Sequence, residues 1–149
     1  MEAFKSAEGW KARVNVVVLK VVSPSCFLIR EAPGPHMSSY TRDFLRLEAD
    51  IKNTMEKHEV RPRNPLLPEI DSVVLVKKPK GREWHRGRVN KILDTMDGYK
   101  VEVTLVDYGE TLLVDRKQLR ELFDESLLEV PFQCVSFSLP ELQPLRWTI

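Results

Sequence analysis

Apolar and more polar side chains alternate along several short segments in the second half of the chain. The clearest segment is 101–106, where Val101, Val103 and Leu105 recur at every second position, as in a half-buried strand. Comparable runs lie at 72–77, 83–92, 99–106, 111–114 and 119–123. Strands this short and this few do not make a sandwich, and closing them into a barrel removes their edges. The pattern therefore predicts a small antiparallel barrel.

The β-branched run 14–22 predicts a strand that is buried on most of its surface, and 26–29 predicts the strand that returns beside it. An isolated hairpin is only marginally stable, so this one needs a partner. The segment 132–139 alternates again and is the expected partner. The two ends of the chain would then form a second β unit, against which the residues 140–149 are expected to pack.

Between these units, apolar side chains recur three or four positions apart from about residue 40 to residue 58, as in an amphipathic helix. They are Phe44, Leu47, Ile51 and Met55. Ser39 or Thr41 is expected to cap the start of the helix. Core packing is the main use expected for this stripe, and partner binding is the alternative. Prolines in 61–68 stop the helix and predict an extended linker.

Composition narrows the class of protein. A hydrophobic fraction of 42% supports a real core, and 23 Lys plus Arg against 22 Asp plus Glu gives no general reason to expect nucleic-acid binding.

Cys26 and Cys134 are expected to be buried free thiols of a reducing compartment. The three histidines lack partners at metal-ligand spacing, so neither metal nor cofactor is expected. With no apolar span and no signal core, a soluble intracellular protein is expected.

One aromatic side chain has a charged setting that suggests chemistry. Tyr108 stands at the end of the 101–106 strand, beside the carboxylates of Asp107 and Glu110. A ring face flanked by acids suits a cationic ligand, because both attract positive charge. The alternative is an ordinary cross-strand aromatic residue.

Two motifs together resemble the core of a Tudor domain: Trp84-His-Arg-Gly-Arg-Val89 and Leu105-Val-Asp-Tyr-Gly-Glu110. Their surroundings, including the run 130–139, resemble the extended form of that domain over nearly the whole chain from about Val14. The resemblance implies a mainly β fold with one linking α-helix, in which a small antiparallel Tudor barrel is inserted in a partial OB, nuclease-like lobe. The implied divisions are an N-terminal tail 1–13, a first OB-like part 14–39, a linking helix 40–59, a proline-rich linker 60–70, a Tudor barrel 71–125 and a returning OB-like part 126–149.

The same resemblance implies recognition of methylated arginine, especially symmetric dimethylarginine near the termini of PIWI-type Argonaute proteins, in an aromatic cage. In this sequence Tyr108 matches one wall of the cage. His85 and Leu105 stand where aromatic residues are expected, and Pro79 lies near the place of another. Glu110 replaces the asparagine that would bond the guanidinium. The implied cage is therefore degenerate.

Losing two or three cation–π walls would remove about 1 to 6 kcal/mol, or roughly one to four orders of magnitude in affinity. A carboxylate at 110 would serve unmethylated arginine at least as well, because methylation blocks bidentate pairing. The resulting hypothesis is a non-catalytic interaction module or scaffold of a germline piRNA-pathway factor. Its implied partner is a PIWI-type Argonaute or another arginine/glycine-rich protein, and its implied location is the cytoplasm, in perinuclear germ granules (nuage).

The sequence also bears on two further classes of function. Basic residues interleaved with stacking side chains suit single-stranded RNA, unless strand alternation sends the charges to different faces. The basic run is Lys77, Lys78, Lys80, Arg82, Arg86, Arg88 and Lys91. An enzyme is not expected, because no carboxylate cluster or nucleophile–base pair is visible, although a parent protein could carry a helicase or other enzymatic domain elsewhere.

Overall fold

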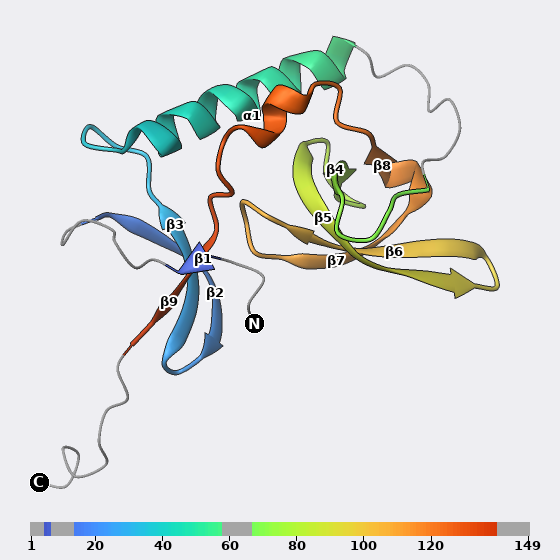
Figure 1. The fold of residues 1–149 in the computed structure, drawn as a ribbon, viewed down its shortest axis with the longest axis horizontal. Coiled ribbons are helices and arrows are strands. Elements are labelled where there is room, and N and C mark those ends of the chain that lie inside the picture. The colour runs from blue at the N-terminus through green and yellow to red at the C-terminus, as the bar shows by residue number, and fades with distance from the viewer. Residues whose placement is uncertain (1–4, 7–13, 58–66, 140–149) are drawn as a thin grey trace, which may run out of the picture.

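The computed structural model describes residues 5–6, 14–57 and 67–139, which form two β-sheets and one α-helix. The chain runs from the smaller sheet through the helix to the larger sheet and then returns to the smaller one (Figure 1). The predicted mainly β fold with one linking helix is confirmed. Most of the predicted tail 1–13 and linker 60–70 lies outside the described residues, as does the predicted packing of 140–149.

The larger sheet is an antiparallel barrel with the strand order β7-β6-β5-β4-β8. Its strands are β4 (Val73–Lys77), β5 (Trp84–Thr95), β6 (Gly98–Leu105), β7 (Thr111–Asp115) and β8 (Leu119–Arg120). Strands β7 and β8 lie at opposite ends of this order, yet only the short helix η1 (Arg116–Gln118) separates them in sequence. The sheet must therefore curl on itself, as predicted. Its interior is filled by Val74, Val76, Val89, Val101, Val103, Leu105, Val114 and Leu119.

The smaller sheet joins the two ends of the chain, in the order β1-β9-β3-β2. Its strands are β1 (Lys5–Ser6), β2 (Val16–Ser23), β3 (Cys26–Glu31) and β9 (Val135–Ser138). The predicted pairing of the N-terminal hairpin with the returning segment is confirmed, because β9 runs antiparallel to β3. In addition, the expected N-terminal tail contributes β1, which pairs with β9 in parallel.

Two strand predictions need correction. The strand predicted to be mostly buried is the edge strand β2, where Val18 and Val21 are 55% and 59% exposed. A valine-rich pattern indicates a strand but does not show which faces other elements cover. The predicted strand 132–139 is also shorter, because its first residues bond to the barrel instead of the sheet. The Gln133 N–H donates to Asp107 and the Cys134 N–H donates to the Val106 carbonyl.

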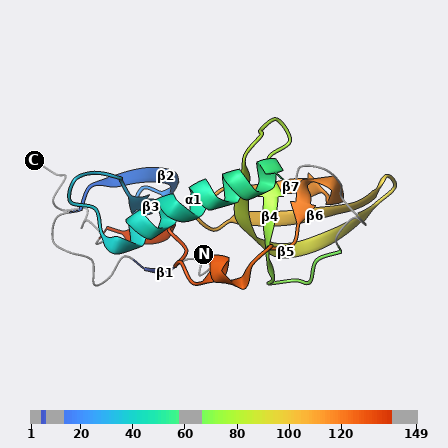
Figure 2. The same cartoon turned by 90° about the horizontal axis from the view of Figure 1, so that it is seen from above.

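The helix α1 (Ser39–Lys57) lies across both sheets, as the two views show (Figures 1 and 2). Phe44, Leu47 and Ile51 are buried and form one core with side chains from the barrel and from the short helix η2 (Glu125–Leu128). This confirms that the apolar stripe packs in the core. The predicted caps are wrong, because the hydroxyl of Ser38 accepts the N–H of Thr41.

Candidate functional site

Tyr108 lies where the barrel, α1 and the smaller sheet meet. Its ring centroid is 4.8 Å from that of His85 on β5 and 6.3 Å from that of Phe44 on α1, both in edge-to-face arrangements. The guanidinium carbon of Arg30, on β3, lies 4.6 Å from the centre of the Tyr108 ring. Side chains from three elements thus converge on the turn after β6.

Electrostatics keep the two rings of this site neutral. The Tyr108 hydroxyl donates to Glu48 Oε2 at 2.5 Å, and burial together with this bond raises the Tyr108 pKa above its usual range, against the opposing effect of Arg30. Burial, helped by the nearby Lys78, lowers the pKa of His85 below its usual value, although Glu48 and other nearby carboxylates oppose this. A neutral imidazole beside a neutral phenol repels no incoming cation.

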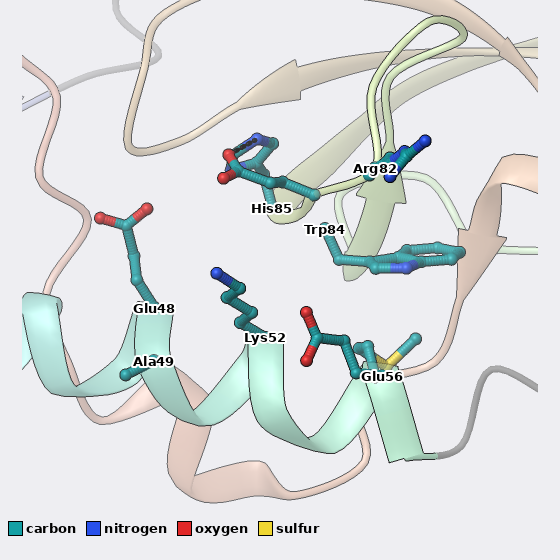
Figure 3. Close-up of a pocket in the computed structure, with 9 residues that line it drawn as sticks. Glu48, Ala49, Lys52, Glu56, Arg82, Trp84 and His85 are labelled. Atoms are coloured by element: carbon teal, nitrogen blue, oxygen red, sulfur yellow. Dashed lines mark ion pairs between the residues drawn. The ribbon is translucent and has the colours of Figure 1, made fainter.

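A pocket of about 450 Å³ opens beside His85, between α1 and the start of β5. Its lining consists of Glu48, Ala49, Lys52, Met55, Glu56, Arg82, Glu83, Trp84 and His85. Figure 3 shows Glu48, Lys52 and Glu56 reaching from the helix toward the strand that carries Trp84 and His85. Carboxylates beside flat aromatic rings are groups that bind a guanidinium, through charge-assisted hydrogen bonds and stacking.

The other residues matched to the cage lie in different surroundings. Leu105 is fully buried in the barrel core, and Pro79 is exposed. The carboxylate of Glu110 accepts a hydrogen bond from Lys78 Nζ at 2.8 Å on the surface. The structure therefore brings Tyr108 and His85 into contact, while the remaining positions supply no further aromatic face.

Asp107 and Arg86 form an ion pair in the interior. Asp107 Oδ2 accepts from Arg86 Nε at 2.9 Å, and Oδ1 accepts from Nη2 at 2.6 Å. The side chain of Arg86 is 0% exposed and that of Asp107 is 3% exposed. Both side chains are enclosed in the interior, which disagrees with the expected roles of Asp107 beside the cage and of Arg86 in contacting RNA. The sequence shows their charges but not the partner that each one has.

The rest of the basic run is divided among different settings. Lys80, Arg82 and Lys91 are exposed, whereas Lys77, Lys78 and Arg88 are partly buried. Lys78 pairs with Glu110, and Lys91 Nζ lies 3.7 Å from Glu102.

Within residues 5–6, 14–57 and 67–139, no cluster of His, Cys, Asp or Glu is placed to hold a metal ion. In the same ranges, no helix is long and apolar enough to cross a membrane.

Sequence reasoning missed three residues of this site: Arg30, Phe44 and Glu48. The sequence predicts Phe44 only as part of the apolar stripe of the helix, and it assigns no role to Arg30 or Glu48. Their meeting with Tyr108 depends on how the smaller sheet and α1 pack on the barrel. No local pattern reports that packing.

Comparisons with known proteins agree with this architecture. The family model described as "Tudor domain" matches residues 10–141. Over 137 residues the chain is 27% identical to the putative ATP-dependent RNA helicase TDRD12 of Homo sapiens. The matched region covers 89% of this chain and 11% of that protein. The chain thus spans about a tenth of the length of this curated relative.

Solved structures extend the comparison to the fold. The Drosophila melanogaster Papi extended Tudor domain, in complex with a Piwi N-terminal R10me2s peptide, has a TM-score of 0.71 at 20% identity, covering 87% of this chain and 61% of that one. The BmPAPI extended Tudor domain in complex with sDMA has a TM-score of 0.69 at 27% identity, covering 88% and 61%. Extended Tudor domain TD3 of mouse TDRD1, in complex with a MILI peptide containing dimethylarginine 45, has a TM-score of 0.68 at 24% identity, covering 89% and 63%. The chain therefore belongs to the Tudor domain family and has the extended Tudor fold.

Proposed function

We propose that this domain is a non-catalytic interaction module that binds an arginine-containing segment of a partner protein, weakly and with little dependence on arginine methylation. Similar extended Tudor domains are solved with peptides that carry methylated arginine. The observation that carries the proposal is the incomplete aromatic site. Tyr108 and His85 contact each other, whereas Leu105 is buried in the barrel and Pro79 is exposed.

The energetics favour a weak site. Each missing aromatic wall costs ~0.5 to 2 kcal/mol of cation–π attraction. The carboxylates beside the rings, Glu48, Glu56 and Glu83, offer a guanidinium charge-assisted hydrogen bonds instead. Methylation keeps the charge of arginine but removes N–H donors, so it weakens such bonds. A site with few rings and several acids therefore gains little from a methyl group.

The partner and setting belong to the same proposal. The solved complexes of related domains contain Piwi and MILI peptides, and the curated relative is a putative RNA helicase. These relatives support a PIWI-type Argonaute or another arginine/glycine-rich protein as the partner. They also support a place in a germline small-RNA pathway, in cytoplasmic germ granules.

Calorimetric titration with arginine–glycine peptides, unmethylated and symmetrically dimethylated, tests this function. We expect the wild type to bind both with similar Kd, and Glu56→Gln to weaken binding because a pocket carboxylate is lost. Glu121→Gln, an exposed glutamate after β8, is the matched control and should leave Kd unchanged.

Two results of the titration would contradict the proposal. A preference of more than about tenfold for the dimethylated peptide, lost in Tyr108→Ala, would show that the reduced cage still reads methylation. Absence of binding by either peptide would instead indicate a scaffold that uses another surface.

A further inference from the structure

An arginine of the chain itself lies on the aromatic ring at the centre of the site. Arg30 reaches from β3 in the smaller sheet, and its guanidinium carbon is 4.6 Å from the centre of the Tyr108 ring and 5.7 Å from that of Phe44. Both distances are within the range of a cation–π contact. Tyr108 is also the only full aromatic ring among the five cage-matched positions.

The environment of Arg30 indicates that the rings hold it in place. Its Nε atom is buried and finds no hydrogen-bond acceptor in the part of the chain that the structure describes. A buried donor without a partner costs free energy, so another interaction must compensate. The two aromatic rings are in position to do so, with Glu48 supplying negative charge at the Tyr108 hydroxyl.

We infer that Arg30 acts as an internal ligand of the Tyr108 ring and sets the specificity of the peptide site. A guanidinium stays protonated in proteins, so it both covers the ring and repels a second cation that approaches it. An arginine from a partner must then displace Arg30 or bind beside it, in the pocket next to His85. This inference rests on the proposed function and adds a cause for weak methylarginine binding that does not depend on the missing walls.

Peptide titration of an Arg30 variant tests the inference. Arg30→Gln should raise the affinity for the symmetrically dimethylated peptide by roughly 2- to 30-fold, the value of one recovered cation–π contact. Arg42→Gln, which removes the same charge from an exposed position on α1, should leave the affinity unchanged. Unchanged or weaker binding by a folded Arg30→Gln variant would overturn the inference.

A second measurement needs neither a variant nor a peptide. In the NMR spectrum of the wild type, ring currents of Tyr108 should shift the side-chain protons of Arg30 upfield relative to those of Arg42. Shifts equal to those of Arg42 would overturn the inference. If no peptide binds to any form of the protein, the proposed function fails, whereas this shift still decides whether Arg30 occupies the ring.

Discussion

A single buried arginine connects the barrel to the segment that returns to the smaller sheet. Arg86 uses Nε and Nη2 to hold Asp107, and it also donates to the carbonyls of Leu127, Val130 and Pro131. Every nitrogen of the guanidinium is therefore bonded. Such satisfaction is what allows a charged group to lie in the interior, because an unpaired buried charge is very costly.

Removing one charge of this pair should destabilise the domain strongly. We expect Asp107→Asn to lower the free energy of unfolding by about 3 to 5 kcal/mol, because the Arg86 charge stays buried without its partner. Urea unfolding would measure the loss. Glu102→Gln, which breaks the partly exposed pair with Lys91, is the control and should cost less than about 1 kcal/mol. Equal losses in both variants would show that the buried pair has no special role.

At the scale of elements, the end of β3 and the start of α1 are fastened by one carboxylate. Glu31 Oε1 accepts from the Ser38 N–H at 2.8 Å and from the Ser38 hydroxyl at 2.7 Å, and it also accepts from the hydroxyl of Thr41. The Ser38 hydroxyl in turn accepts the Thr41 N–H. The first turn of the helix is thus fixed to the smaller sheet.

Replacing the cap should measure how much this connection stabilises the helix. Ser38→Ala is expected to lower the free energy of unfolding by ~1 kcal/mol or slightly more, because it removes an N-cap and a partner of Glu31. The neighbouring Ser39 is exposed, so Ser39→Ala should change stability by no more than about 0.5 kcal/mol. Thermal unfolding of both variants would check this, and a larger effect at Ser39 would contradict the assignment of the cap.

Most elements are predictable from the sequence, because their patterns depend on neighbours along the chain. The stripe Phe44, Leu47 and Ile51 indicates both α1 and its buried face. The cap is less predictable, since three hydroxyl residues, Ser38, Ser39 and Thr41, stand near the start of the helix. Glu31, on the preceding strand, favours Ser38 by accepting a hydrogen bond from its hydroxyl. The prediction that β2 is mostly buried is wrong for a similar reason, because the exposure of a strand depends on which elements lie beside it.

At the scale of the whole molecule, the turn after Tyr108 brings the barrel against the smaller sheet. Gly109 adopts φ +79°, and a Cβ placed there would lie 3.2 Å from Cys134 Sγ and 3.2 Å from Leu28 Cδ1. Both neighbours belong to the core of the smaller sheet. The junction therefore requires a residue that tolerates a left-handed backbone and has no side chain.

Gly109→Ala should weaken this junction through both effects. We expect a loss of about 1 to 3 kcal/mol in the free energy of unfolding, from the backbone conformation and from the close contacts. Gly34→Ala is the control, because no atom lies within 4 Å of the added carbon and its φ is not in the left-handed region. Guanidinium-induced unfolding would compare the two, and similar midpoints would show that the junction can relax without cost.

The candidate site shows where prediction from sequence ends. Tyr108 and His85 were identified because they sit in motifs, and motifs are local. The roles of Asp107 and Arg30 were not predictable, since one is decided by Arg86 and the other by packing of the smaller sheet on the barrel. A site at a junction of elements also depends on residues that lie outside any motif, here Arg30, Phe44 and Glu48.

The pairing of β3 with β9 has a consequence for the order in which the domain is made. Partners such as Phe27 and Phe137 are more than 100 residues apart, so the ribosome needs about 5 to 20 s to supply the second strand after the first. The strands β4 to β8 lie closer together in sequence and all precede β9, so they can begin to associate before then. Until β9 is synthesised, the valine-rich hairpin β2–β3 therefore has an unpaired strand edge at β3. We expect chaperones that bind such edges to contact the nascent chain before β9 emerges.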